Sequence, residues 1–408
     1  MLNKLRNRRE YFDEPNEYRI LRLARDARQI SRVEIANRIQ LSKTTVSEIT
    51  NRFVESGFLK PAGQGSSSAR GGRKRELLDF NPDAAYVIGI DIERTRCDVA
   101  VTNLDATLIH RASVSYPAGT PPVEVLKQVV DLVHGFGKGH GDALKKTVGL
   151  GIGLPGVIDP VQGTIKVADT LKGWEGFDVS AFMTERFDLP VFVENDVKAR
   201  TLGEMIFGHG RNISDAVYFW MGDGIGAGIV IGGRLHHGFT NSAGEIGYNE
   251  LGQAAMLQAH FPLLFKEQSD IGDLLSKANI LRAIEQLFPG NHATLDQFIA
   301  AVEQENPSAQ KLLREISEMI GSLCINMINM LNPEVVLLGG ELFWKCHQLV
   351  HLIQAKVSSD ILPVPANAVK ILPSSLKDDG VLFGSVGHVL FDLFRPTRGV
   401  REMAEQAT

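Results

Sequence analysis

The first part of the chain alternates apolar and polar residues with the period of an α-helix. Three short segments between residues 17 and 57 show this pattern. Ser31, followed three residues later by Glu34, predicts a capping box at the start of the second helix. Ser42 is the expected N-cap of the third helix. The residues expected to be buried in that helix are Val46, Ile49 and Phe53. The pattern predicts three helices that share one small core.

The polar face of the third helix predicts contacts with a nucleic acid. Short polar side chains and a lysine in the first turn of the second helix of such a pair suit base edges and phosphates in a major groove. The candidate DNA-binding residues on this helix are Ser42, Lys43, Thr44, Thr45, Ser47 and Arg52.

A β-wing is expected after this helix. Residues 58–60 and 73–80 read as two strands on either side of a Gly/Ser-rich tip. Four basic residues near the tip could contact phosphates or a minor groove: Arg70, Arg73, Lys74 and Arg75. Helix pair, turn and basic wing together predict a winged helix-turn-helix DNA-binding domain over residues 1–82. The alternative is a small helical domain with a solvated basic face and a disordered linker.

From Tyr86 the apolar pattern changes to period two, which is typical of strands. The expected strands are 86–92, 97–104, 107–116, 148–154, 191–194, 216–221, 225–231 and 335–338. The expected helices include 123–134, 182–187 and 197–207, with a mostly helical stretch between 231 and 331. The order β-β-β-α-β-α is expected to occur twice, so we predict an α/β architecture of two lobes around a cleft.

Charge is distributed unevenly along the chain. Residues 1–80 carry 17 Lys and Arg against 10 Asp and Glu, whereas the whole chain has a net charge of −5. A basic segment ahead of an acidic remainder favours two modules with different partners, of which the first binds a polyanion. No run of about twenty apolar residues and no secretory signal is present, so we expect a cytoplasmic protein.

Four polar or glycine-rich clusters are expected at the cleft. The first is the turn that ends at Gly156, and the second is Glu194-Asn195-Asp196 at a strand end. The third runs from Gly222 to Gly228, and the fourth places Glu245 between glycines. Each has a structural interpretation as well: a sharp bend, an N-cap at Asp196 or a hairpin turn without a ligand. The functional interpretation is a carboxylate that accepts a hydroxyl proton, amide contacts to hydroxyls and loops that bind phosphate.

Together with the N-terminal module, these clusters resemble the ROK family of repressors and sugar kinases. The segments that carry the resemblance are 153–156, 194–196, 222–228, 232–238, 243–247 and 333–340. The resemblance implies an actin-like ATPase (ribonuclease H-like) fold with two lobes over residues 83–408. It places lobe 1 at about 83–195 with a C-terminal helix at about 380–394, and lobe 2 at about 196–379. It also implies that Asp196 matches the general base of the kinases and that the sugar contacts are Gly156, Asn195, Asp196 and Glu245.

Departures from the kinase pattern predict that this chain is not an enzyme. Kinases of the family have glycines after the aspartate that matches Asp91, and here Glu93 and Arg94 follow it. The second phosphate loop carries Asp223 where a threonine is usual. A carboxylate beside a phosphate costs about 1–4 kcal/mol at intermediate dielectric, which weakens nucleotide binding tenfold or more. Phosphoryl transfer depends on positioning and charge stabilisation, so Asp196 is expected to be vestigial as a catalytic base.

The zinc motif of the family is also missing. Members usually have Gly-His and three close cysteines after the glutamate that matches Glu245, whereas this chain has Tyr248 and no cysteine between Cys97 and Cys324. His236, His237 and His260 are interpreted as solvated. We therefore expect neither a metal site nor a cofactor.

These observations predict a sequence-specific DNA-binding transcriptional regulator. We expect it to repress a carbohydrate-utilisation operon. Its expected partners are double-stranded operator DNA and a sugar or sugar phosphate, and its expected assembly is a homodimer, with a tetramer as the alternative. Two other classes remain open: an active ATP-dependent sugar kinase with a DNA-binding arm, and a regulator that responds to a partner protein.

Overall fold

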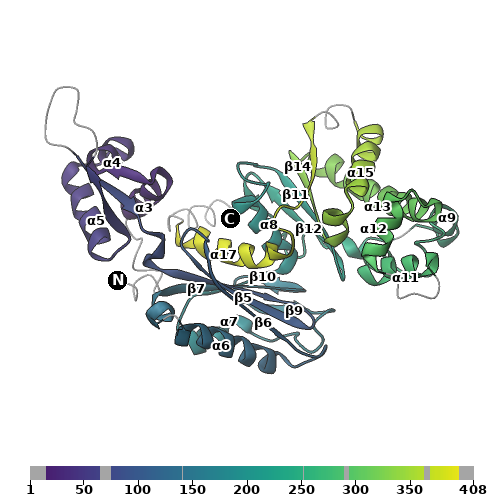
Figure 1. The fold of residues 1–408 in the computed structure, drawn as a ribbon, viewed down its shortest axis with the longest axis horizontal. Coiled ribbons are helices and arrows are strands. Elements are labelled where there is room, and N and C mark those ends of the chain that lie inside the picture. Colours follow the sequence, from purple (N-terminus) through teal and green to yellow (C-terminus); the bar gives the residue numbers. More distant parts are fainter. Residues whose placement is uncertain are drawn as a thin grey trace.

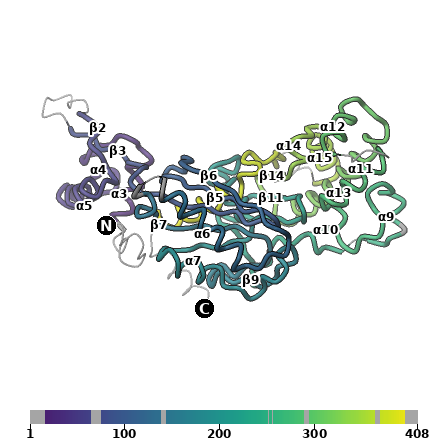
Figure 2. The backbone as a smooth tube through the Cα atoms, turned by 60° about the horizontal axis from the view of Figure 1, so that its bottom comes forward, coloured from purple at the N-terminus to yellow at the C-terminus, as the bar shows by residue number. Residues whose placement is uncertain are grey.

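The computed structural model describes residues 15–64, 75–139, 141–250, 252–288, 294–362 and 368–394. Figure 2 shows three parts in a row: the N-terminal helices and strands at one end, a sheet in the middle, and a second sheet with its own helices at the other end. None of the helices in these described ranges is long and apolar enough to cross a membrane.

The N-terminal part is a winged helix-turn-helix. Its elements are α3 (Pro15–Ala27), β1 (Gln29–Ser31), α4 (Arg32–Ile39), α5 (Lys43–Glu55), β2 (Leu59–Gln64) and β3 (Glu76–Phe80). The capping box between Ser31 and Glu34 is present, and the Ser42 side chain accepts a hydrogen bond from the backbone N–H of Thr45. These predicted caps are confirmed. Strand β1 was not predicted, and it pairs with β3 to complete a sheet of order β1-β3-β2.

The middle part is built on a five-stranded sheet of order β10-β7-β4-β5-β6. Its strands are β4 (Tyr86–Ile92), β5 (Arg96–Asn103), β6 (Leu108–Ser115), β7 (Thr147–Leu154) and β10 (Val191–Asn195). The first three pair antiparallel, and β7 and β10 add in parallel beside β4. Helices α6 (Pro122–Gly139) and α7 (Val179–Phe187) lie on one face (Figure 1). A hairpin of β8 (Val157–Asp159) and β9 (Thr164–Val167) was not predicted.

The second sheet repeats the same strand order. It runs β13-β12-β11-β14-β15, with an antiparallel first trio and two parallel strands beside β11. The strands are β11 (Ala216–Met221), β12 (Ile225–Ile231), β13 (Arg234–Leu235), β14 (Val335–Gly339) and β15 (Lys370–Pro373). The helices of this part are α9 (Ala254–His260), α10 (Ile271–Leu274), α11 (Lys277–Leu287), α12 (Leu295–Glu303), α13 (Pro307–Leu331), α14 (Glu341–Lys345) and α15 (His347–Asp360). The predicted repetition of the α/β scheme is confirmed.

Two helices, α8 (Asp196–Phe207) and α17 (Gly380–Leu393), lie between the sheets (Figure 1). Helix α17 packs on β4 and β7 of the first sheet, and α8 contacts β11 and β12 of the second. The two helices touch backbone to backbone, because a Cβ at Gly384 would collide with the carbonyl oxygen of Ala199. Close approach of this kind requires glycine. The helix pair therefore joins the two sheets.

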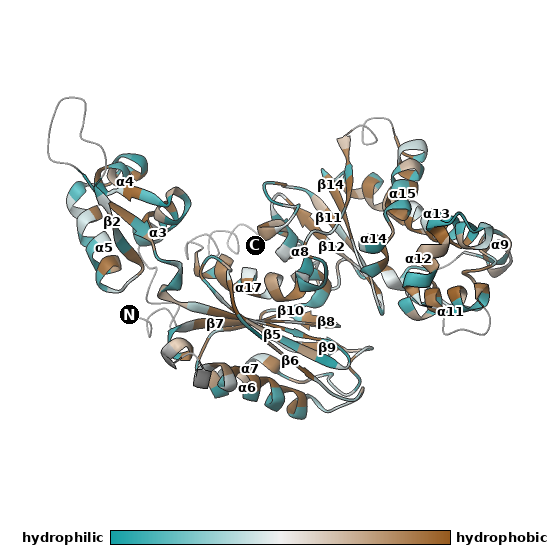
Figure 3. Cartoon of the chain, in the orientation of Figure 1, coloured by the Kyte–Doolittle hydropathy of each residue, from teal (hydrophilic) through white to brown (hydrophobic). Residues whose placement is uncertain are grey.

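Hydrophobic residues concentrate on the strands and on the inner faces of the helices, while the outer helix faces are polar (Figure 3). One core cluster crosses from the winged helix-turn-helix into the middle part. It includes Leu21, Phe80, Leu104, Leu390 and Phe394, all buried. The winged helix-turn-helix is thus packed against the rest of the chain rather than tethered only by its connecting segment.

Candidate functional site

The first candidate surface is the start of α5. Ser42, Lys43 and Thr44 are exposed, and Thr45 and Ser47 are half-buried. The Ser42 and Thr45 hydroxyl oxygens lie 2.8 Å apart, which fixes the first turn of the helix. Short polar side chains and an exposed lysine at a helix N-terminus are suited to hydrogen-bond with base edges and phosphates.

The other predicted DNA contacts are only partly described. Arg52 is exposed but forms an ion pair with Glu17 of α3, so it also ties two helices together. Arg75 is exposed just before β3. Arg70, Arg73 and Lys74 lie outside the described residues. In the wing, Arg32 of α4 forms an ion pair with Glu76 of β3, which holds the wing against the helices.

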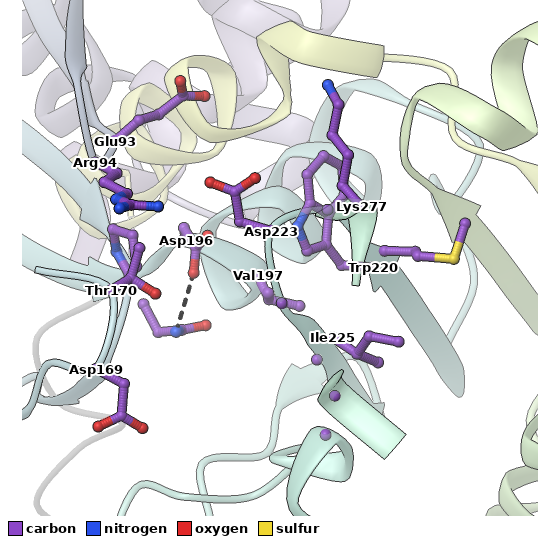
Figure 4. Close-up of a pocket in the computed structure, with 18 of the residues that line it drawn as sticks. Glu93, Arg94, Asp169, Thr170, Asp196, Val197, Trp220, Asp223, Ile225 and Lys277 are labelled. Atoms are coloured by element: carbon purple, nitrogen blue, oxygen red, sulfur yellow. Dashed lines mark hydrogen bonds between the residues drawn. The ribbon is translucent and has the colours of Figure 1, made fainter. Parts of the chain in front are cut away.

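A cavity of about 550 Å³ opens between the two sheets. Its walls come from the end of β4, the loop after β7, the start of α8, the loop between β11 and β12, and the segment around Glu245. Figure 4 shows Glu93 and Arg94 on one wall, Trp220, Asp223 and Lys277 on the other, and Asp196 between them. All four clusters predicted for the cleft contribute lining residues.

The strand-end cluster meets the first glycine turn inside this cavity. Asn195 is the N-cap of α8, since its side-chain oxygen accepts from the backbone N–H of Lys198. The Asn195 amide nitrogen donates to the carbonyl oxygen of Gly156 at 2.9 Å and to Asp196 Oδ1 at 3.1 Å. The interpretation of Asp196 as an N-cap was therefore wrong, and its carboxylate is left to face the cavity. Burial raises the pKa of Asp196, against the opposing effect of Arg200.

Two partly buried polar contacts brace this cluster and were not predicted. His237 Nε2 lies 2.7 Å from Glu194 Oε2, and the pair holds the pKa of Glu194 below its usual value although burial acts in the opposite direction. The buried Lys198 donates to the carbonyl oxygen of Asn241 at 2.8 Å. The interpretation of His237 as a solvated histidine was wrong. These contacts tie α8 to the loop that leads to Glu245.

Glu245 and Tyr248 line the opposite side of the cavity. Glu245 is half-buried, and its burial raises its pKa, with Lys198 opposing the shift. The Tyr248 hydroxyl donates to the carboxylate of Asp169, which comes from the middle part. This hydrogen bond raises the pKa of Tyr248 to about 12. This hydrogen bond thus links two walls of the cavity.

The far half of the cavity is formed by two loops, one after β4 and one between β11 and β12. These are the loops whose sequences resemble phosphate loops. Asp91 is buried, and its burial raises its pKa well above the usual range, with Arg200 opposing the shift. Arg200 is buried as well, and its guanidinium stacks 3.8 Å from the centroid of the Trp220 ring. Arg94 and Asp223 are both exposed in the cavity. Charged side chains from both loops therefore project into this half of the cavity.

Metal ligands are not gathered anywhere in the described part of the chain. No group of three or more His, Cys, Asp or Glu side chains there has an arrangement that could hold a metal ion. Cys97, Cys324 and Cys346 are each buried as free thiols.

Comparison with known sequences gives the family. Residues 87–390 match the sequence profile of the ROK family. The chain belongs to the ROK family. Residues 13–60 match the winged helix-turn-helix DNA-binding profile. The resemblance drawn from the motifs, and the order of a winged helix followed by a ROK domain, are confirmed.

Named ROK relatives include repressors of nearly the same length. The xylose repressor of Caldicellulosiruptor bescii is 27% identical over 391 residues, which cover 93% of this chain and 96% of that protein. The N-acetylglucosamine repressor of Escherichia coli is 23% identical over 366 residues, or 88% of this chain and 89% of that protein. A solved ROK family transcriptional regulator, a homologue of the E. coli MLC protein, superposes with a TM-score of 0.76 at 20% identity. The superposition covers 93% of this chain and 96% of that one.

Proposed function

We propose that this ROK protein is a transcriptional repressor that binds operator DNA as a homodimer and changes its affinity when a sugar or sugar phosphate enters the cleft. The xylose and N-acetylglucosamine repressors, which match almost the full length of the chain, support this function. The exposed polar start of α5 supports recognition of a major groove. A two-fold dimer would place two such helices on a palindromic site.

The observation that carries the proposal is a single helix that reaches from the cleft to the DNA-binding part. At one end of α17, Arg200 Nη1 donates to the carbonyl oxygen of Lys377 at 3.3 Å, and Asp378 lines the cavity. The backbone contact between Gly384 and Ala199 binds α17 to α8, the helix that begins at Asp196. A ligand that shifts α8 therefore shifts α17.

The other end of α17 is embedded in the winged helix-turn-helix. Phe394, just after the helix, packs edge-on against Phe80 of β3 with ring centroids 6.2 Å apart. The Arg25 guanidinium lies 4.7 Å from the centroid of the Phe394 ring, and Arg25 also pairs with Asp105 at 3.4 Å. With about 1.5 Å rise per residue, the 14 residues of α17 span about 21 Å. The helix is long enough to transmit a displacement from the cleft to the DNA-binding part.

Operator binding provides the test. Labelled duplexes from the region upstream of the gene are titrated with the full-length protein, with and without a panel of sugars, and followed by fluorescence anisotropy. Lys43→Ala combined with Thr44→Ala should weaken binding about tenfold or more and lower the salt slope by about one. Lys127→Ala on the exposed face of α6 removes the same charge away from α5 and serves as the control. Wild-type affinity in the double variant would refute recognition by α5.

The alternative of an active sugar kinase is supported by one feature, the half-buried Asp196 carboxylate that faces the cavity. Against it, Asp91, Glu93 and Asp223 surround the space where phosphates would lie. Negatively charged side chains close to the phosphates disfavour binding of a nucleoside triphosphate. A coupled assay decides: sugar-dependent ADP release that disappears in Asp196→Asn would establish kinase activity. We expect no release above background.

A further inference from the structure

The cleft is larger than one sugar ring requires. A hexose displaces about seven waters, or about 200 Å³ at about 30 Å³ per water. The cavity measures about 550 Å³. Gly156, Asn195, Asp196 and Glu245 line its near half, which leaves the far half, between the loops at Asp91 and Asp223, for something else.

Two buried polar atoms in the far half have no partner. Among the described residues, neither Asp91 Oδ1 nor Arg200 Nε has a hydrogen-bond partner. Asp91 is 5% exposed and Arg200 is 4% exposed, and both line the cavity. Stacking on Trp220 and the bond to Lys377 hold Arg200 in place. A buried donor and a buried acceptor left unpaired are costly, so the site is built for a ligand that satisfies both.

The chemistry of these two atoms selects among ligands. A hydroxyl group can pair with a carboxyl group in either protonation state and also accept from a guanidinium, whereas a phosphate oxygen can only accept. The acidic side chains around the far half are Asp91, Glu93, Asp223 and Glu341, and burial raises the pKa of the first two. Of the cations there, Lys277 is already paired with Glu341 at 3.0 Å, and Arg94 and Arg200 remain. An uncharged polyhydroxylated group fits this environment better than a nucleotide or a sugar phosphate.

We propose that the far half is a second sugar subsite, so that the effector is an uncharged disaccharide or longer oligosaccharide. One unit lies on Asn195, Asp196 and Glu245, and the next unit places a hydroxyl group that hydrogen-bonds to Asp91 and accepts from Arg200. The inference rests on the proposed function and specifies its ligand. The far half of the cavity, which resembles the nucleotide site of kinases, then distinguishes a monosaccharide from a longer carbohydrate.

Calorimetric titration of the full-length protein tests this directly. The probes are matched pairs: xylose and xylobiose, N-acetylglucosamine and chitobiose, glucose and cellobiose, glucose and maltose. One disaccharide should bind about tenfold or more tightly than its own monosaccharide, which corresponds to a hydrogen-bonded charged group. ATP and glucose 6-phosphate are titrated in parallel, and we expect no heat from either.

Two variants locate the second unit. Asp91→Asn keeps the shape of the side chain but replaces one carboxyl oxygen with an amide nitrogen, which can only donate. Gly224→Leu adds a side chain where a Cβ would have nothing within 4 Å and where no left-handed backbone is required. Both should lower disaccharide affinity to that of the monosaccharide and change monosaccharide affinity less than about twofold. Asp131→Asn, an exposed aspartate on α6, is the matched control and should change neither.

The outcomes separate the two proposals. If a monosaccharide binds and alters operator affinity, but no disaccharide binds more tightly, the second subsite is refuted and the proposed function stands. Equal losses for both sugars in Asp91→Asn, in a variant whose Tm is no lower than that of the wild type, would also refute the subsite. If a phosphorylated sugar binds most tightly, the charge argument is wrong. If no sugar of any length binds or alters operator affinity, the proposed function itself fails.

Discussion

The contact between Phe394 and the winged helix-turn-helix offers the sharpest test of how the cleft communicates with DNA. Phe394 is 7% exposed and contacts both Phe80 and Arg25. Truncating a buried phenylalanine to alanine costs about 3–5 kcal/mol in protein cores. Since Phe394 lies at the end of a helix, we take the lower value, about 3 kcal/mol. This is as large as a typical allosteric coupling free energy, about 1–3 kcal/mol.

Phe394→Ala should therefore uncouple the DNA-binding part from α17. The sugar-dependent change in operator Kd, expected to be about 5–150-fold in the wild type, should fall below about twofold. Sugar binding measured by calorimetry should stay within about twofold, because the cavity is at the other end of α17. Operator binding by anisotropy, at one fixed salt concentration, completes the measurement.

The same truncation at Phe239 is the control, since that side chain is fully exposed. It should leave the sugar response unchanged. If Phe394→Ala retains the full wild-type ratio of operator affinities with and without sugar, α17 does not carry the signal, and another route between cleft and DNA must exist. Loss of sugar binding in the variant would refute the expectation that Phe394 acts only at the DNA-binding end of α17.

Three further perturbations test the site. Tyr248→Phe removes the hydrogen bond to Asp169 across the cavity mouth, and we expect a few-fold loss of sugar affinity by calorimetry; unchanged affinity would show that the bond is incidental. Burial raises the pKa of Asp91 above its usual value of 3.8. At a pH between these two values, the folded protein holds a proton that the unfolded chain has released. The free energy of unfolding therefore falls as pH rises through the folded pKa. Asp91→Asn should therefore raise Tm more at about pH 8 than at about pH 5, and an equal gain at both would contradict the assignment. Gly244 has φ +89° and a Cβ there would collide with backbone, so Gly244→Ala should displace Glu245 and abolish sugar binding without changing operator affinity in the absence of sugar.

Local sequence signals were sufficient for most of the fold. The capping box at Ser31 and the N-cap at Ser42 involve residues three positions apart, so the sequence contains both partners of each contact. The strands at 86–92 and 216–221 have strong apolar patterns because they lie at the centres of the two sheets. By contrast, β1 has only three residues and depends on pairing with β3, nearly fifty positions later, for its existence.

Residues that line the cavity were predictable from the sequence, but their contacts were not. Asn195, Asp196 and Glu245 were identified from motifs, and all three line the cavity. Which of the adjacent Asn195 and Asp196 caps α8 depends on backbone direction at the strand end, and the motif does not encode this. The bonds from Tyr248 to Asp169 and from His237 to Glu194 join positions far apart in the chain. No periodicity or spacing rule connects such residues.

The junction at Asp105 bears on how the two modules came to be joined. Arg28 and Arg25 of the DNA-binding part both pair with Asp105 in the tight turn after β5, beside the apolar cluster around Phe80. Without the ROK domain, the winged helix-turn-helix would expose that apolar surface and the two arginines to water, and we would expect it to self-associate. A chimera that combines the winged helix-turn-helix of one relative with the ROK domain of another would then need matched surfaces as well as a suitable linker. Joining the two chains alone would not give a working protein. We therefore expect each winged helix-turn-helix to share its ancestry with the ROK domain in the same chain.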